Sequence, residues 1–112
     1  MKMVIAIIRP QRMEMVKNAL EKVGIFGLTV NEVKGRGRQK GVTQMWRGSK
    51  YRVDLLQKIE IIVVVKEVDV DKCIRTIVES ARTGEIGDGK IFVLPLEKTI
   101  RIRTGESGEE AV

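Results

Sequence analysis

The segment KIEIIVVVK, residues 58–66, decides the fold. It begins with polar and apolar residues in alternation and continues as a β-branched apolar run, which is typical of a strand in a buried sheet. Residues 2–9, KMVIAIIR, form a second and nearly continuous apolar run, as expected of a central strand. Pro10 follows directly and ends this strand, because proline is suited to the first turn of a helix.

Weaker patterns predict the remaining strands. Residues 27–31 alternate, so a strand is expected there that runs to about Lys34. Another is expected in IFVLPL, residues 91–96, where Pro95 indicates a sheet edge or a strand end. Residues 99–104 alternate again and predict a short additional strand.

Two amphipathic helices are expected between these strands. Residues 11–23 place apolar residues at positions i, i+3, i+4 and i+7, and Gly24 ends the pattern. The second helix is expected to begin near Asp69 or Asp71, because either aspartate can cap it. The two apolar stripes are Val16, Ala19, Leu20 and Val23, and Val70, Cys73, Ile74, Ile77, Val78 and Ala81. We expect Cys73 to be a core residue, since a buried free cysteine behaves as a small hydrophobe.

The order β-α-β-loop-β-α-β predicts an α+β ferredoxin-like sandwich in a single domain, residues 1–112. Two helices would cover only one face of its antiparallel sheet. The other face, expected to be built from Val4, Ala6, Ile8 and part of residues 61–65, would remain apolar and exposed. Such a patch calls for a partner, so a homo-oligomer is expected.

The composition restricts the possible functions. The chain has no histidine and one cysteine, which argues against Ser-His and Cys-His nucleophile pairs, an internal disulfide and a structural zinc site. No apolar run is long enough for a transmembrane helix and the N-terminal run is too short for a signal peptide, so a cytoplasmic protein is expected. A net charge of +6 favours anionic partners: nucleic acid, nucleotide phosphates or small carboxylates.

A long basic segment separates the second and third strands. From Lys34 to Lys58 it holds eight basic residues against one acid, Asp54. No apolar period of 2 or 3.6 runs through residues 38–52, so an unpatterned loop is expected over 37–55. Such a loop is either functional or a solvated insertion. Because strand-like runs hold both of its ends, a functional loop is the better interpretation.

A glycine-rich turn, TGEIGDGK, occupies residues 83–90. Its spacing is close to that of a P-loop, but Ile91 stands where a serine or threonine would bind magnesium, and a helix precedes it where a strand should. Closely spaced glycines still allow backbone N–H groups to converge on an anion, with Lys90 adding charge. A plain helix-to-strand turn is the alternative.

Arg101 and Arg103 form the last basic feature. In an extended strand they would point to the same side, about 7 Å apart, while Ile100 and Ile102 would point to the core. Arginine suits phosphate oxygens, although a solvated strand face is the alternative for this pair alone. Together with the two glycine-rich basic loops, the pair favours a polyphosphate pocket.

The chain resembles the PII nitrogen-regulatory signal-transduction proteins, of the GlnK-like kind, over essentially its whole length. The likeness is carried by NEVKGRGRQKG (31–41), RGSKYRVDLL (47–56), TGEIGDGKIFV (83–93) and IRIRTGE (100–106). This resemblance implies a ferredoxin-like homotrimer whose clefts between subunits bind ATP or ADP.

The resemblance also implies roles for single residues. The nucleotide-binding residues would be Gly35, Arg38, Gly87, Asp88, Gly89 and Lys90 of one chain, in part within the loop 82–90, and Thr29, Arg101 and Arg103 of its neighbour. Mg²⁺ would be bridged by the ATP phosphates, the Gln39 side chain and 2-oxoglutarate, and Lys58 would pair with a carboxylate of 2-oxoglutarate.

The loop 37–55 would then be the output of the protein. The resemblance implies that it regulates an ammonium transporter or nitrogen-assimilation enzymes, so the membrane would be reached only through the transporter. Arg47 would contact the partner at a channel mouth, and Tyr51 or Ser49 are possible modification sites. The ligands would bias the loop between two states.

The runner-up is a ferredoxin-like RNA-binding module, because the RNA-recognition motif shares this element order and the chain is basic. Its third strand would need aromatic residues to stack on bases, and residues 58–66 contain none. Nucleic acid is therefore not expected as a partner. An enzyme is not expected either, since there is no histidine and no evident converging pair of acids.

Overall fold

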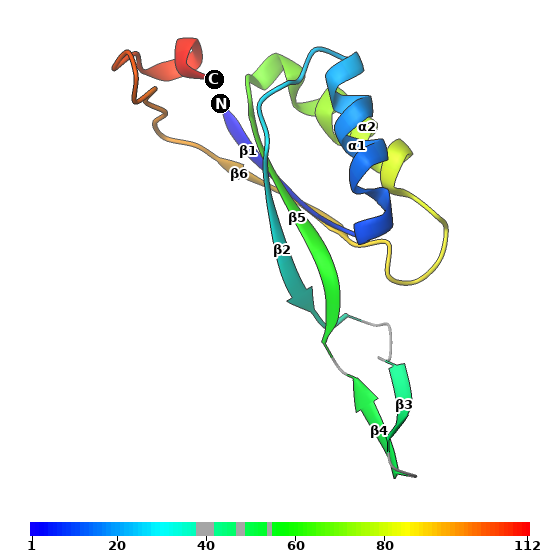
Figure 1. Cartoon of the computed structure of the whole chain (residues 1–112). Helices are drawn as coiled ribbons and strands as arrows, with labels where there is room; N and C mark the ends of the chain where they lie inside the picture. The colour runs from blue at the N-terminus through cyan, green and yellow to red at the C-terminus, as the bar shows by residue number, and fades with distance from the viewer. Residues whose placement is uncertain (38–41, 47–48, 54) are drawn as a thin grey trace.

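A four-stranded antiparallel sheet carries two helices on one face (Figure 1). The computed structural model describes residues 1–37, 42–46, 49–53 and 55–112. The sheet order is β2-β5-β1-β6, and each neighbouring pair is antiparallel. The elements are β1 (Lys2–Ile8), α1 (Met13–Lys22), β2 (Thr29–Gly35), β3 (Val42–Trp46), β4 (Ser49–Val53), β5 (Leu56–Val65), α2 (Val70–Ala81) and β6 (Lys90–Pro95), with short 3₁₀ turns at Pro10–Arg12, Glu67–Asp69 and Gly108–Ala111. This topology confirms the predicted ferredoxin-like fold.

The strands with the strongest apolar runs lie in the centre of the sheet. β1 pairs with β5 from Lys2 opposite Val65 to Ile8 opposite Ile59. β6 lies at one edge and ends at Pro95, in agreement with the expectation that this proline marks an edge or an end.

Each helix places its predicted apolar stripe in the core. Val16 and Leu20 of α1 and Cys73 and Ile77 of α2 are almost wholly buried. Each large aliphatic side chain buried in this way stabilises the fold by about 1.5–3 kcal/mol. α2 begins after Asp69, as predicted, but the carboxylate of that residue makes no capping hydrogen bond. Within the described part of the chain, no helix has the length and apolar character needed to cross a bilayer.

The prediction that Val4, Ala6 and Ile8 line the exposed face of the sheet is wrong. All three belong to the buried core beneath the helices. Successive side chains of a strand point to opposite faces, so the intervening residues of β1 face away from the helices. A continuous apolar run contains no polar residue that would show which alternate set is buried, and shifting the choice by one residue exchanges the two faces.

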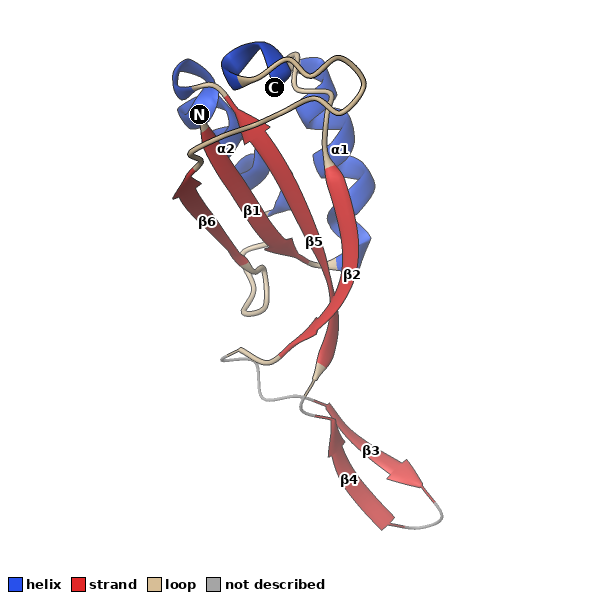
Figure 2. Cartoon of the chain, turned by 90° about the vertical axis from the view of Figure 1, so that its left-hand side faces the viewer, coloured by secondary structure: helices blue, strands red, loops and turns tan. Residues whose placement is uncertain are grey.

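Figure 2 shows the face of the sheet that the helices leave uncovered, called the open face below. This face is nevertheless apolar. Residues paired across β5, β1 and β6 fill its middle: Met3, Ile5, Ile62, Val64, Phe92 and Leu94. Phe92 and Leu94 remain 49% and 44% exposed. A contiguous apolar surface of this kind is typical of a face that contacts a partner.

The basic segment between β2 and β5 contains a β-hairpin, so the prediction of an unpatterned loop is wrong in this respect. β3 pairs with β4 from Val42 opposite Val53 to Trp46 opposite Ser49. Two residues, 47 and 48, separate the strands in the sequence, the commonest hairpin spacing. A two-stranded hairpin forms from local pairing and β-branched or aromatic residues, and it needs no apolar period.

The short strand predicted over residues 99–104 is also wrong. The chain turns there, and the backbone N–H of Gly105 donates to the carbonyl of Arg101 at 2.7 Å. Ile100 and Ile102, expected to point to the core, are 53% and 99% exposed. Within the described residues this segment has only an isolated bridge at Ile100 in place of a neighbouring strand. Its alternation of apolar and polar residues therefore does not correspond to a sheet.

β6 enters the sheet directly after Gly89, which has a φ of +102°. A Cβ atom on this residue would overlap the backbone carbonyl of Ile7 in β1. Glycine is required on both grounds, because other residues rarely adopt this φ and none lacks a Cβ. This contact fixes where the loop 82–90 meets β1.

Burial gives a first prediction, for Cys73. Its thiol pKa is raised to about 11, mainly by burial and further by the Asp69 carboxylate, whereas Lys72 opposes the rise. At pH 8 the thiolate is therefore scarcer than in the unfolded chain by about 100-fold, and thiolate is the reactive form. Modification by iodoacetamide, followed by mass spectrometry, should be at least that much slower in the folded protein than in guanidinium chloride. Equal rates would contradict the buried position.

The contact at Gly89 gives a second prediction. Gly89→Ala should lower the free energy of unfolding by more than about 3 kcal/mol, because the new Cβ meets backbone that cannot move aside. Gly84→Ala is the matched control: its φ is +92°, but a Cβ there meets nothing within 4 Å, so only the backbone cost of about 1 kcal/mol applies. Urea unfolding of both variants measures the difference, and equal losses would show that the Gly89 contact is not tight.

Candidate functional site

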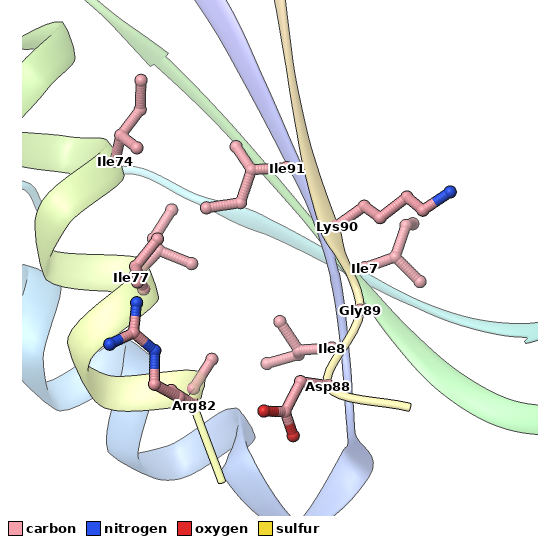
Figure 3. A pocket seen from close by; sticks show the side chains of 11 residues that line it. Ile7, Ile8, Ile74, Ile77, Arg82, Asp88, Gly89, Lys90 and Ile91 are labelled. Carbon is pink, nitrogen blue, oxygen red and sulfur yellow. The ribbon is translucent and has the colours of Figure 1, made fainter. Parts of the chain in front are cut away.

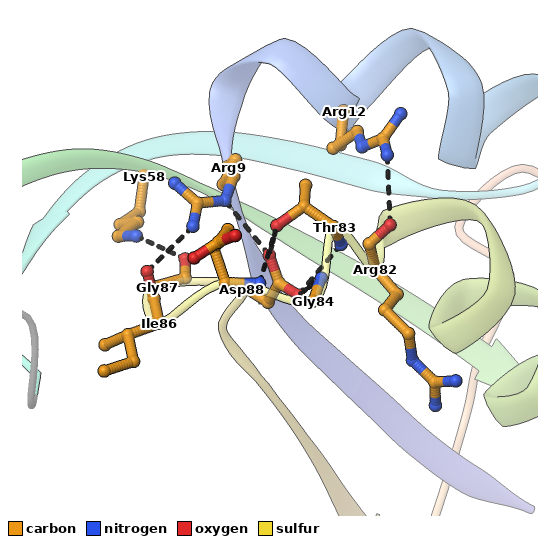
Figure 4. A network of polar contacts seen from close by, with 10 residues as sticks. Arg9, Arg12, Lys58, Arg82, Thr83, Gly84, Ile86, Gly87 and Asp88 are labelled. Carbon is orange, nitrogen blue, oxygen red and sulfur yellow. Dashed lines mark hydrogen bonds and ion pairs between the residues drawn. The ribbon is translucent and has the colours of Figure 1, made fainter.

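The loop 82–90 between α2 and β6 is organised around the carboxylate of Asp88 (Figure 4). One carboxylate oxygen accepts the backbone N–H groups of Thr83 and Gly84 at 2.9 and 2.8 Å. The other oxygen accepts the Thr83 hydroxyl and, at 3.1 Å, the Nε of Arg9. Two backbone N–H groups of the loop thus converge on an anion that belongs to the chain itself.

These contacts keep Asp88 ionised. The hydrogen bond from the Thr83 hydroxyl is the largest influence that holds the pKa of the Asp88 carboxyl far below its usual range. Partial desolvation opposes this effect, whereas the two backbone N–H groups and Arg9 add to it. An acid with four donors around it stays charged at any physiological pH, so its pairing with Arg9 does not depend on pH in that range.

Lys58 and Arg9 hold the tip of the same loop through its carbonyl groups. The Nζ of Lys58 donates to the Gly87 carbonyl at 2.8 Å, and a guanidinium N–H of Arg9 donates to the Ile86 carbonyl at 2.8 Å. Burial lowers the pKa of Lys58, the positive charge of Arg9 lowers it further, and Asp88 opposes both. A Cβ on Gly35 would lie 3.9 Å from the Lys58 side chain, so this glycine borders the same place.

Lys90 lies on the open face beside the loop. It pairs with Ile7, and both side chains point away from α2, whereas Ile8 and Ile91 point toward it (Figure 3). The space between Ile91 and α2 is a cavity of about 290 Å³ with mostly aliphatic walls, and Asp88 closes one end of it. The Lys90 ammonium is directed away from this cavity.

The structure therefore brings together one set of residues that the sequence singled out. We call Gly35, Lys58, Gly87, Asp88, Gly89 and Lys90 the loop group. Figure 4 shows Lys58, Gly87 and Asp88 of this group, where the loop 82–90 meets β1 and β5.

A second set lies around the C-terminal segment, residues 99–112. Thr29 lines a cavity of about 700 Å³ together with Val64 of β5 and the final residues Ala111 and Val112. The guanidinium of Arg101 is tied to the same segment by hydrogen bonds to residues further along it. Arg103 lies in the turn of this segment and is exposed. We call Thr29, Arg101 and Arg103 the tail group.

The loop group and the C-terminal segment lie at opposite ends of the sheet (Figures 1 and 2). β6 begins beside Ile7, and at its other end the N–H of Leu96 donates to the Met1 carbonyl at 3.2 Å. The seven residues of β1 separate these two places by about 20 Å. One chain therefore presents the loop group and the tail group at separate places and does not bring them together.

Several predicted residues fall in or next to the undescribed part of the chain. Arg38, Gln39 and Arg47 lie outside the described residues. Tyr51 and Ser49 belong to β4, opposite Gln44 and Trp46. The magnesium ligand implied by the resemblance is Gln39, and the described residues contain no cluster of three or more His, Cys, Asp or Glu side chains suited to a metal.

Sequence reasoning missed Arg9, Thr83 and Glu106. Arg9 meets Asp88 across 79 positions of sequence, and no local pattern reports such a contact. Its only signal is its place at the end of a central strand, next to Pro10. Thr83 and Glu106 lie inside the quoted motifs TGEIGDGK and IRIRTGE. Roles could be assigned from the sequence only to neighbouring glycines and charged residues in these motifs.

Comparisons with known proteins identify the family of this chain. The family model for nitrogen regulatory protein P-II matches residues 1–106. Nitrogen regulatory protein P-II 2 of Methanothermobacter thermautotrophicus is 58% identical over 112 residues, which cover all of this chain and 97% of that protein. Nitrogen regulatory proteins P-II of Microchaete diplosiphon and Pasteurella multocida are 55% and 53% identical to this chain. Each match covers the whole of this chain and the whole of the relative. A full-length match at this identity settles the family: the chain belongs to the P-II nitrogen regulatory proteins.

Proposed function

We propose that this chain is a nitrogen-status signal protein that binds ATP or ADP, Mg²⁺ and 2-oxoglutarate and regulates an ammonium transporter or a nitrogen-assimilation enzyme. It acts as a regulator and not as an enzyme. It works in the cytoplasm and reaches the membrane only through a transporter. Membership of the family supports the regulatory role, and the layout of the two residue groups supports the mode of ligand binding.

The separation of the loop group from the tail group carries the proposal. Both groups contain residues suited to phosphate, yet they belong to opposite ends of one sheet. A head-to-tail contact brings the loop group of one copy to the tail group of the next, and a closed ring repeats that contact at every interface. The proposed homotrimer meets this requirement, and the apolar open face offers surface for the contact.

The chemistry of the two groups suits a polyphosphate. Lys90 supplies an ammonium on the open face, and Arg101 and Arg103 supply guanidinium groups that can each donate several hydrogen bonds to phosphate oxygens. Gly87, with a φ of +106°, and Gly89 keep the loop free of side chains where a ligand would approach its backbone. Bound Mg²⁺ would neutralise part of the phosphate charge, and Gln39 would be its protein ligand.

Lys58 suits the second effector. Its ammonium is partly buried and lies near a second cation, Arg9, so its charged form is disfavoured. A carboxylate of 2-oxoglutarate placed beside it would favour that charged form. Lys58 also donates to the Gly87 carbonyl. A ligand at Lys58 would therefore change the affinity for a ligand at the glycine-rich loop, and the reverse would hold as well.

The segment 37–55, which contains the β3–β4 hairpin, serves as the output. It begins two residues after Gly35 and ends three residues before Lys58, so both proposed ligands would bind next to its base. Its basic residues suit an acidic partner surface, Arg47 serves as the partner contact, and Tyr51 or Ser49 as modification sites.

Nucleotide binding tests the core of this proposal. The double variant Arg101→Ala/Arg103→Ala should raise the Kd for ATP and ADP at least about 100-fold, since each lost charged hydrogen bond is worth about 1.5–3 kcal/mol. Calorimetry measures the affinity, and light scattering should show that the variant remains a trimer. Arg75→Ala, an exposed arginine of α2, is the control and should leave the affinity unchanged. A monomeric wild-type protein, or one indifferent to millimolar ATP and ADP, would refute the proposal.

The second effector is tested through Lys58. With Mg-ATP present, wild-type protein should bind 2-oxoglutarate, whereas Lys58→Met should lose this binding by at least about tenfold, because an ion pair in a partly buried site disappears. Lys22→Met makes the same charge change at an exposed position of α1 and should have no effect. Equal 2-oxoglutarate affinities of the wild type, Lys58→Met and Lys22→Met would show that Lys58 does not bind this ligand.

A further inference from the structure

The C-terminal segment, residues 99–112, folds back on itself. The N–H of Arg101 donates to the Glu106 carbonyl at 2.8 Å, and the N–H of Gly108 donates to the Thr99 carbonyl at 3.0 Å. Ile100 and Ser107 form an antiparallel bridge between these bonds. The segment is therefore a closed turn in which residues 106–108 lie beside residues 99–101.

This turn holds the side chain of Arg101 at two points. One terminal nitrogen of the guanidinium lies 3.3 Å from a carboxylate oxygen of Glu106, and the other donates to the Glu110 carbonyl at 2.9 Å. A guanidinium has five N–H donors, so these two contacts leave three for a ligand. The Arg101 side chain is still 38% exposed, so the remaining donors can be reached.

The same segment also walls a cavity. Ala111 and Val112 line the space of about 700 Å³ that Thr29 and Val64 line from the sheet. The residues that anchor Arg101 and the residues that close this cavity are thus only one to six positions apart in the chain. A change that releases one of them would disturb the other.

We propose that Glu106 is a positioning residue that sets nucleotide affinity by holding Arg101. This inference rests on the proposed function and deepens it. Glu106 fixes a long side chain in one orientation before the phosphates arrive, so less side-chain freedom is lost when they bind.

Glu106 also places a negative charge close to the expected phosphates, and this charge acts against binding. The two effects have opposite signs, which makes the proposal testable. If orientation dominates, removing the charge weakens nucleotide binding. If repulsion dominates, removing it strengthens nucleotide binding.

The test is a double-mutant cycle on the full-length chain. Glu106→Gln should raise the Kd for ATP and for ADP about fivefold, the upper end for a partly exposed ion pair. In the Arg101→Gln background, which keeps Arg103 and hence a measurable affinity, Glu106→Gln should cause no further change. Glu109→Gln is the matched control, because it removes the same charge from an exposed residue of the same segment.

Three results would overturn the proposal: a lower Kd for Glu106→Gln, the same increase with and without Arg101, or a change equal to that of Glu109→Gln. Hydrogen exchange at the amides of Arg101 and Gly108 shows whether the turn persists in each variant. An increase in Kd that appears only together with loss of this protection would mean that Glu106 maintains the turn and does not position Arg101. Wild-type protein that binds neither nucleotide overturns the proposed function as well, whereas the other results overturn this inference alone.

Discussion

The contacts of the Asp88 carboxylate are the constraint on which the described site depends. This one acid binds two backbone N–H groups of its own loop, the Thr83 hydroxyl and Arg9 at the end of β1. The loop is thereby fixed to the central strand of the sheet and not merely suspended between α2 and β6. Gly89 can then pass against the backbone of β1, and Lys90 enters the sheet with its side chain on the open face. A glycine-rich loop left without such an anchor would lose much more conformational freedom on binding a ligand.

The loop group and the tail group share one feature: an internal carboxylate holds an arginine. Asp88 pairs with Arg9 at one end of the sheet, and Glu106 pairs with Arg101 at the other. A basic chain with a net charge of +6 would otherwise place mutually repelling cations around each site. The acids reduce that repulsion in the absence of ligand and restrict the orientation of the long side chains. The positive charge of the chain is therefore less freely available to arbitrary anions than the composition suggests.

The helices and strands of the core could be predicted from the sequence, because burial of one face imposes a periodic pattern of apolar residues on them. The apolar runs at residues 2–9 and 58–66 and the stripes of both helices predicted the core, and they are confirmed. The period alone could not decide which face of β1 is buried, because every residue from Met3 to Ile8 is apolar. It suggested a strand over residues 99–104, where no strand of the described residues lies alongside, and it missed the β3–β4 hairpin, which pairs locally. The candidate site was predictable where glycines and cations cluster in one motif. Arg9 was not, because its partner is distant in sequence.

The topology of the sheet explains why one site would be divided between two copies. In a ferredoxin-like fold β1 lies between β5 and β6, so the loop that enters β6 and the segment that leaves it are separated by the full length of β1. No rearrangement of side chains can shorten a strand. A ligand that requires both ends must therefore bridge two molecules, and its binding energy becomes coupled to how the molecules associate. In the proposed assembly, the base of the segment 37–55 adjoins each such junction through Gly35 and Lys58. A change in the bound ligand then alters contacts at the root of the output segment directly, without a pathway through the core.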